Sequence, residues 1–185
     1  WSANNILRPG GNILEHVGTT PFGQRAISAC HLEHEQILDV DVQDTNHDKW
    51  ELLRDLTTAR EHFGVTDRDL SVLQALVSFY PGNVLEDGDK LTVFPSNRAL
   101  AERAHGMAER TLRRNVSNLV RAGLILLKDS PNGKRYACKD ASGALTHAFG
   151  LSLRPLLVHA REIAQAALNA RDAAEELKRA REQAV

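Results

Sequence analysis

The sequence predicts a mostly α-helical protein with a small amount of β structure. Apolar residues recur at helical spacing in several stretches of the 185-residue chain. Two short apolar runs, 91–94 and 124–130, are instead followed by a proline or by a Pro-Asn-Gly turn, which is typical of strands. The hydrophobic content of 42% is sufficient for a packed core.

The first 48 residues are expected to form a flexible or partly ordered arm. Residues 1–20 include a Pro-Gly-Gly sequence and show no periodicity. Residues 39–48, DVDVQDTNHD, are acidic and rich in Asp and Asn, which is typical of a loop or linker.

Two helices are expected to follow the arm. The first covers 49–63 and ends at Gly64, and the second covers 67–80 with Asp67 as its N-cap. A Pro-Gly pair then stops the second helix.

A strand at 91–94 leads into a second pair of helices joined by a tight turn. The helix at 96–106 begins with Ser96 as N-cap and ends at a glycine, and an arginine-rich helix follows at 110–121. Met107 lies between the two helices, where an apolar side chain would fill the gap between them.

The remaining pattern indicates a β-hairpin and a long helix. The runs 124–130 and 134–140 flank Asn132-Gly133, which is a strong hairpin signal. A helical pattern then fills about 153–183. This order predicts a winged helix-turn-helix over residues 49–150, preceded by the arm at 1–48 and followed by a C-terminal helix at 151–185.

The charge is distributed unevenly, although the whole chain carries a net charge of only −1. Residues 31–95 hold five Lys/Arg against fourteen Asp/Glu, whereas residues 96–140 hold ten against four. The basic segment contains the helix-turn-helix and the hairpin, and local charge governs the binding of a polyanion. A solvated basic face on a small α+β domain is the alternative interpretation.

The basic segment offers the residue types that bind double-stranded DNA. Arginine pairs with guanine edges, asparagine pairs with adenine, and hydroxyl groups reach bases or phosphates. Arg110, Thr111, Arg113 and Arg114 occupy the first turns of the predicted recognition helix and are expected to read bases. The other candidate DNA contacts are Asn97, Arg98, Ser117, Asn118, Arg121, Asn132, Lys134, Arg135 and Tyr136.

Other chemistries find little support in the sequence. Cys30, His31, His34 and His47 fit no structural zinc spacing, and no phosphate-binding G-x-x-x-x-G-K-[ST] loop is present. No nucleophile with a positioned base can be nominated, and no apolar run approaches a membrane span. We therefore expect a binding protein without catalysis, cofactor or metal, in a reducing cytoplasm.

Five stretches together resemble the N-terminal region of the RepC replication initiators of RepABC-type plasmids. They are TTPFGQR (19–25), DRDLSVLQALVSFYP (67–81), VFPSNRALAERAHGMAERTLRR (93–114), VRAGLI (120–125) and SPNGKRYACKD (130–140). The resemblance covers about 19–158. It implies sequence-specific binding to an origin that lies within the initiator's own coding sequence, and a further C-terminal region after this chain.

The expected partners are origin DNA, host replication proteins and, on DNA, a second copy of the chain. The expected location is the bacterial cytoplasm, in association with the plasmid or nucleoid, and no membrane partner is expected. Two residues depart from what the pattern favours. Ala108 stands before the recognition helix, where a capping Ser or Thr is common, and Cys138 stands in a basic strand, where a cation would be expected. A transcriptional regulator is an alternative function. A replisome or partition adaptor that binds a protein through the acidic segment is another.

The C-terminal helix carries an apolar seam whose partner the sequence leaves open. The seam repeats with alternating spacings of four and three residues, which is typical of helix pairing. It consists of Leu156, Ala160, Ile163, Ala167, Ala170, Ala174 and Leu177. Self-association and packing against the chain's own 49–80 region are equally favoured, because a seam of alanines buries little area.

Overall fold

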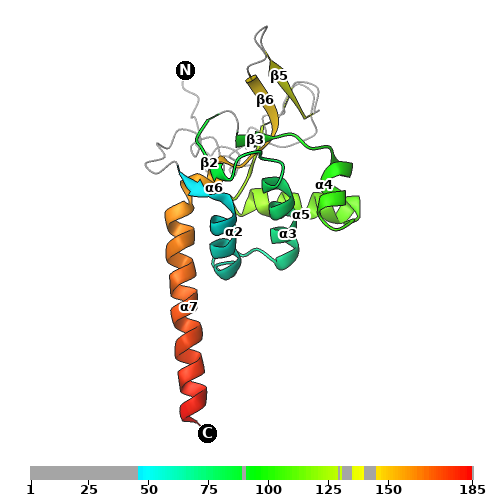
Figure 1. Cartoon of the computed structure of the whole chain (residues 1–185). Coiled ribbons are helices and arrows are strands. Elements are labelled where there is room, and N and C mark those ends of the chain that lie inside the picture. Colours follow the sequence, from blue (N-terminus) through cyan, green and yellow to red (C-terminus); the bar gives the residue numbers. More distant parts are fainter. Residues whose placement is uncertain (1–45, 89–90, 129, 131–134, 140–144, 185) are drawn as a thin grey trace, which may run out of the picture.

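The computed structural model describes residues 46–88, 91–128, 130, 135–139 and 145–184, so the predicted arm lies almost wholly outside the described residues (Figure 1). The prediction of a mostly α-helical chain with a small β component is confirmed. The helices are α2 (Lys49–Thr58), α3 (Asp67–Val77), α4 (Asn97–Arg103), α5 (Glu109–Arg121), α6 (Arg154–Val158) and α7 (Ala160–Gln183). The strands are β1 (His47–Asp48), β2 (Val84–Leu85), β3 (Thr92–Val93), β4 (Leu126–Lys128), β5 (Tyr136–Lys139) and β6 (Leu145–Ser152).

Side-chain caps fix where two of the central helices begin. Thr66 is the N-cap of α3, and its hydroxyl and backbone N–H form a capping box with Asp69. The prediction of Asp67 as the cap was therefore wrong by one residue, because the reciprocal bond needs an acid three positions after the cap. At α4 the predicted cap is confirmed, since the Ser96 hydroxyl accepts from the Ala99 N–H at 3.1 Å.

The turn between α4 and α5 is built from left-handed backbone. Gly106 has a φ of 71°, and the preceding His105 also has a positive φ of 60°. The half-buried Met107 packs against the core, as its position in the sequence predicts. Its sulfur lies 3.3 Å from the amide nitrogen of the buried Asn115, which ties the turn to α5.

The strand pairing differs from the predicted hairpin. β4 and β5 both pair antiparallel with β6, so they run in the same direction and cannot form a hairpin with each other. The predicted pairing of 124–130 with 134–140 was wrong because β6, which was not predicted, is the common partner. Residues 140–144 join β5 to β6, which makes those two strands the antiparallel hairpin.

β6 is also the centre of the small sheet, since its other pairing joins it to β3. This pairing requires a glycine. A Cβ at Gly150 would lie 2.4 Å from the carbonyl oxygen of Val93. The resulting order of a helix (α3), a short strand (β3), two helices (α4 and α5) and the strands β4 to β6 is consistent with a winged helix-turn-helix.

The core lies between the helices and the sheet. Leu56 of α2, Leu73 of α3, Leu119 of α5 and Leu151 of β6 are all fully buried and belong to one cluster. Buried Lys49 is accommodated beside this cluster because its Nζ donates to the Tyr80 carbonyl at 2.7 Å. Desolvation lowers the pKa of Lys49, and the neighbouring Asp48 partly offsets this effect.

The predicted helix at 153–183 is interrupted at His159, which separates α6 from α7. The first half of α7 packs on α2, where Ala166 and Ala167 cluster with Ala59 and Phe63. The packing of the seam against the chain's own domain is therefore confirmed for this half.

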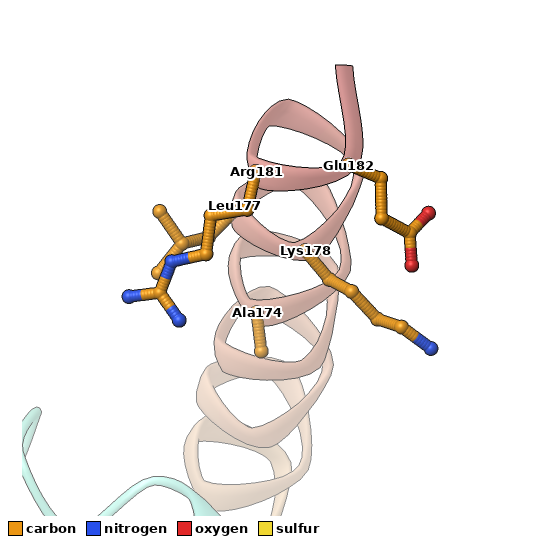
Figure 2. A pocket seen from close by; sticks show the side chains of 5 residues that line it. All are labelled: Ala174, Leu177, Lys178, Arg181 and Glu182. Atoms are coloured by element: carbon orange, nitrogen blue, oxygen red, sulfur yellow. The ribbon is translucent and has the colours of Figure 1, made fainter. Parts of the chain in front are cut away.

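The second half of α7 runs past α2 and away from the rest of the molecule (Figure 1). Figure 2 shows Ala174, Leu177 and Arg181 on the surface of this free end. Leu177 remains 53% exposed, so the end of the predicted seam has no partner within the described part of the chain.

Candidate nucleic-acid interface

The helix α5 separates a buried apolar face from a basic exposed face. Leu112, Val116 and Leu119 are buried against the core, and α5 contacts both α3 and α4. The exposed side chains on the other side form what we call the outer face of α5. They are Arg110, Arg113, Arg114, Ser117 and Arg121. Thr111 lies at the edge of this face and is half-buried.

Two arginines of the outer face make no polar contact with the described residues. Arg110 and Arg114 are exposed and have no hydrogen bond or ion pair within that part of the chain. A guanidinium without an internal partner keeps all five N–H donors for an external acceptor. These two side chains are therefore the most available cations on the outer face.

Arg113 is held by a carboxylate from the first turn of its own helix. Its Nη2 lies 2.6 Å from Oε1 of Glu109, and the same oxygen accepts from the Asn97 amide at 3.2 Å. The hydrogen bonds from Asn97 and Arg113, together with the charge of Arg113, lower the pKa of Glu109. Asn97 in turn accepts from Arg135 at 3.1 Å, so these four residues form a chain of contacts that we call the Glu109 network.

Asn118 and Arg121 are engaged further along α5. The Asn118 amide donates to Oδ1 of buried Asp69 at 3.2 Å and accepts from Arg121 at 2.7 Å. Asn118 therefore links α5 to α3, and its amide is used inside the protein. Arg121 stays exposed beside it, about three turns from Arg110.

Of the other predicted contacts, Arg98 is exposed at the start of α4 and pairs with Glu102 at 3.1 Å. Arg135, which precedes β5, also donates to the Pro95 carbonyl at 3.1 Å. Tyr136 is half-buried and its ring lies 5.1 Å from that of Phe149, which favours a packing role. Asn132 and Lys134 lie outside the described residues.

Sequence reasoning missed three residues that organise this surface. Glu109 is an acid among candidate cations, and its spacing of four residues from Arg113 is the sequence signal of a helical ion pair. Asp69 serves both the α3 cap and Asn118. Arg103 stacks 3.7 Å from the Phe79 ring centroid and donates to Ser78, which secures α4 against the end of α3.

No three His, Cys, Asp or Glu side chains among the described residues are grouped so that they could hold a metal ion. Of the residues weighed for zinc, only His47 falls within that part, where it belongs to β1. In the described part of the chain, no helix has the length and apolar character needed to cross a membrane.

Comparison with known proteins places this chain within a family. The family model described as "Replication protein C N-terminal domain" matches residues 25–185. A "Putative replication protein C" of Sinorhizobium fredii (strain NBRC 101917 / NGR234) is 48% identical over 164 residues, which cover 89% of this chain and 41% of that protein. A protein of the same name from Rhizobium rhizogenes is 47% identical over 149 residues, which cover 80% and 37% of the two chains.

The chain thus spans about two fifths of the length of these curated relatives. No solved structure matches it. Because the family model covers most of the chain and the relatives share nearly half of the aligned residues, the chain belongs to the replication protein C family and corresponds to its N-terminal domain.

Proposed function

We propose that this chain binds a specific double-stranded DNA sequence at the replication origin of a RepABC-type plasmid and that this binding starts replication. The observation that carries the proposal is the outer face of α5. There Arg110 and Arg114 project from a helix whose opposite face is packed into the core, and neither makes a polar contact with the residues that the structure describes. Membership of the replication protein C family supports the biological context.

In this proposal α5 is the recognition helix and lies in the major groove. Arg110 and Arg114 on its first turns contact guanine edges, because an α-helix fits that groove and arginine pairs with guanine through two hydrogen bonds. Arg121 at the far end of α5 and Arg98 on α4 contact phosphates, which set the register without carrying sequence information.

The chain acts by binding rather than by catalysis, and it needs no cofactor or metal. Energy for opening the duplex then comes from strain in the bound DNA or from host replication proteins. The arginines of α4 and α5 belong to the basic segment 96–140, whose charge attracts phosphates. This mechanism operates in the bacterial cytoplasm, where the plasmid resides.

Footprinting across the plasmid's replication region, including the initiator's own coding sequence, tests the proposal. We expect a protected site within the origin that is lost with Arg114→Ala and kept with Arg161→Ala, an exposed arginine on α7. Protection at a promoter alone would make the chain a transcriptional regulator. No protected site anywhere would favour an adaptor that binds proteins, and would refute the proposal.

A further inference from the structure

An acidic side chain stands at the start of the otherwise basic outer face of α5. Glu109 is the first residue of that helix, and Arg110, Arg113 and Arg114 follow it within five residues. A carboxylate repels phosphates, so at a DNA-binding surface it lowers affinity for every duplex alike. Its place in the first turn of α5 suits the helix dipole, and its side-chain contacts give it a second role beyond affinity.

The contacts of Glu109 show what it controls. Its Oε1 holds Arg113 at 2.6 Å and accepts from Asn97 of α4 at 3.2 Å. The Glu109 and Arg113 side chains are 57% and 69% exposed, so this pair adds little to folding stability. The pair instead fixes the orientation of Arg113, because a short charge-assisted bond restricts the rotamers of a long arginine side chain.

The other end of the Glu109 network reaches the β5–β6 hairpin. Asn97 accepts from Arg135 at 3.1 Å, and Arg135 also donates to the Pro95 carbonyl at 3.1 Å. The network therefore connects the hairpin, the start of α4 and the start of α5 through side chains alone. A shift of the hairpin would be transmitted through Asn97 to the carboxylate that holds Arg113.

We infer that Glu109 is a specificity-determining positioning residue, which orients Arg113 toward a base edge and withholds it from phosphates. The inference rests on the proposed function and deepens it. With Nη2 of Arg113 held by Glu109, the remaining N–H donors of the guanidinium stay available for a base edge. Asn97, which the sequence favoured as a DNA contact, supports Glu109 instead.

The test compares the full chain with Glu109→Gln and with a matched control, Glu175→Gln. Glu175 forms the same kind of exposed pair with Arg179, four residues on and 3.1 Å away, on the free half of α7. Both variants remove one negative charge. Binding is measured by fluorescence anisotropy on a duplex that the parent chain selects from a random-sequence pool and on a scrambled duplex, over a series of salt concentrations.

We expect Glu109→Gln to bind the scrambled duplex more tightly and to lose about fivefold or more in the affinity ratio of selected to scrambled duplex. Glu175→Gln keeps the parent's ratio. In an Arg113→Ala background, Glu109→Gln has no further effect on the ratio, because Glu109 acts through Arg113. Asn97→Ala lowers the ratio in the same direction, and thermal melting shows that all variants are folded.

An unchanged ratio for Glu109→Gln, in a parent that does discriminate between the duplexes, overturns the inference and leaves the proposed function standing. An additive effect of Glu109→Gln and Arg113→Ala overturns it as well. A parent that enriches no sequence from the pool overturns the proposed function, and the inference with it.

Discussion

The arginines of α5 share a helix and a charge, yet their surroundings give them different uses. Arg113 is bound to Glu109 and Arg121 to Asn118, whereas Arg110 and Arg114 make no such contact with the described residues. Removing an unpaired arginine leaves no buried partner behind. Its loss should therefore report on DNA binding alone, without a change in folding stability.

Arg114→Ala should weaken binding to the selected duplex by about 1–3 kcal/mol if the side chain holds a guanine. The melting temperature should not change, because Arg114 is exposed. Arg161→Ala removes an equally exposed cation from α7 and serves as the control. If the two variants bind alike, Arg114 contributes only general charge and α5 is not the reading helix.

Glu162 connects the turn after α2 to the start of α7. His62 Nε2 lies 2.9 Å from one of its oxygens and His159 Nδ1 lies 2.8 Å from the other. The contact with His62 lowers the pKa of Glu162, partial burial opposes this, and His159 adds to the lowering. A carboxyl whose pKa is lower in the folded chain stabilises the fold above its ordinary pKa and loses that effect as the pH falls.

Glu162→Gln should therefore lower the melting temperature at neutral pH, and its difference from the parent should shrink as the pH falls below about 4.5. The effect is small because half of the Glu162 side chain is exposed. Glu176→Gln, on the exposed half of α7, controls for the change in net charge. A difference that stays constant from neutral to acidic pH would rule out the carboxylate as its cause.

Most of the helices were predictable because an apolar period marks them in the sequence, although their ends were less so, since α2 stops at Thr58 and not at Gly64. Ser96 caps α4 in the sequence and in the structure, whereas the helix ends at Arg103, three residues before the predicted stop at Gly106. The sheet was less predictable, because β6 pairs with three segments at once and only those pairings make it a strand. The Asn-Gly turn suggested a nearer partner for β4, and tertiary pairing with β6 overrode it.

The surface of α5 was also only partly predictable, because some of its contacts are with residues far away in the sequence. Its basic face follows from helical periodicity, which is a local property of the sequence. The engagement of Asn118 with Asp69 and of Asn97 with Arg135 joins residues far apart in the chain. No local pattern shows which polar side chains the fold has already used, so the sequence predicts both asparagines as DNA contacts.

The start of α5 has no capping side chain, although the backbone of Ala108 has the conformation of a capping residue. Ala108 has φ −59° and ψ 138°, close to the −65° and 155° of the capping residue Ser96, but it supplies no side-chain bond. Ala108→Ser should stabilise the chain by about 0.5–1 kcal/mol in urea unfolding, because a serine oxygen can accept a free N–H of the first turn. Ser96→Ala should destabilise it by a similar amount. If only the second effect appears, the N-terminus of α5 is already satisfied by other groups.

The basic surface of α4 and α5 and the free half of α7 lie on different sides of the molecule. α4 and α5 lie on the side away from α7, and the free half of α7 extends beyond the packed domain (Figure 1). A surface used for DNA and a helix end available to another protein segment would therefore not compete for space. The fold can present both at once without rearrangement.

Self-association in free solution should nevertheless be weak. The strongest part of the apolar seam, with Ile163 and Ala167, is already buried in the chain's own domain, which leaves Ala174 and Leu177 exposed. One leucine and a few alanines bury too little area for a stable dimer at about 25 cal/mol per Å². Sedimentation at micromolar concentration should therefore show a monomer.

Pairing on DNA is a separate matter, because two chains on adjacent sites reach an effective concentration on the order of millimolar. A duplex with two sites one helical turn apart should then bind two copies cooperatively, and Leu177→Glu should reduce that cooperativity while leaving single-site affinity unchanged. Glu175→Gln, which changes only an exposed ion pair of the same helix, is the control. A tight dimer without DNA would show that the exposed end of α7 associates more strongly than its composition allows. Independent binding of the two copies would restrict α7 to its packing against α2.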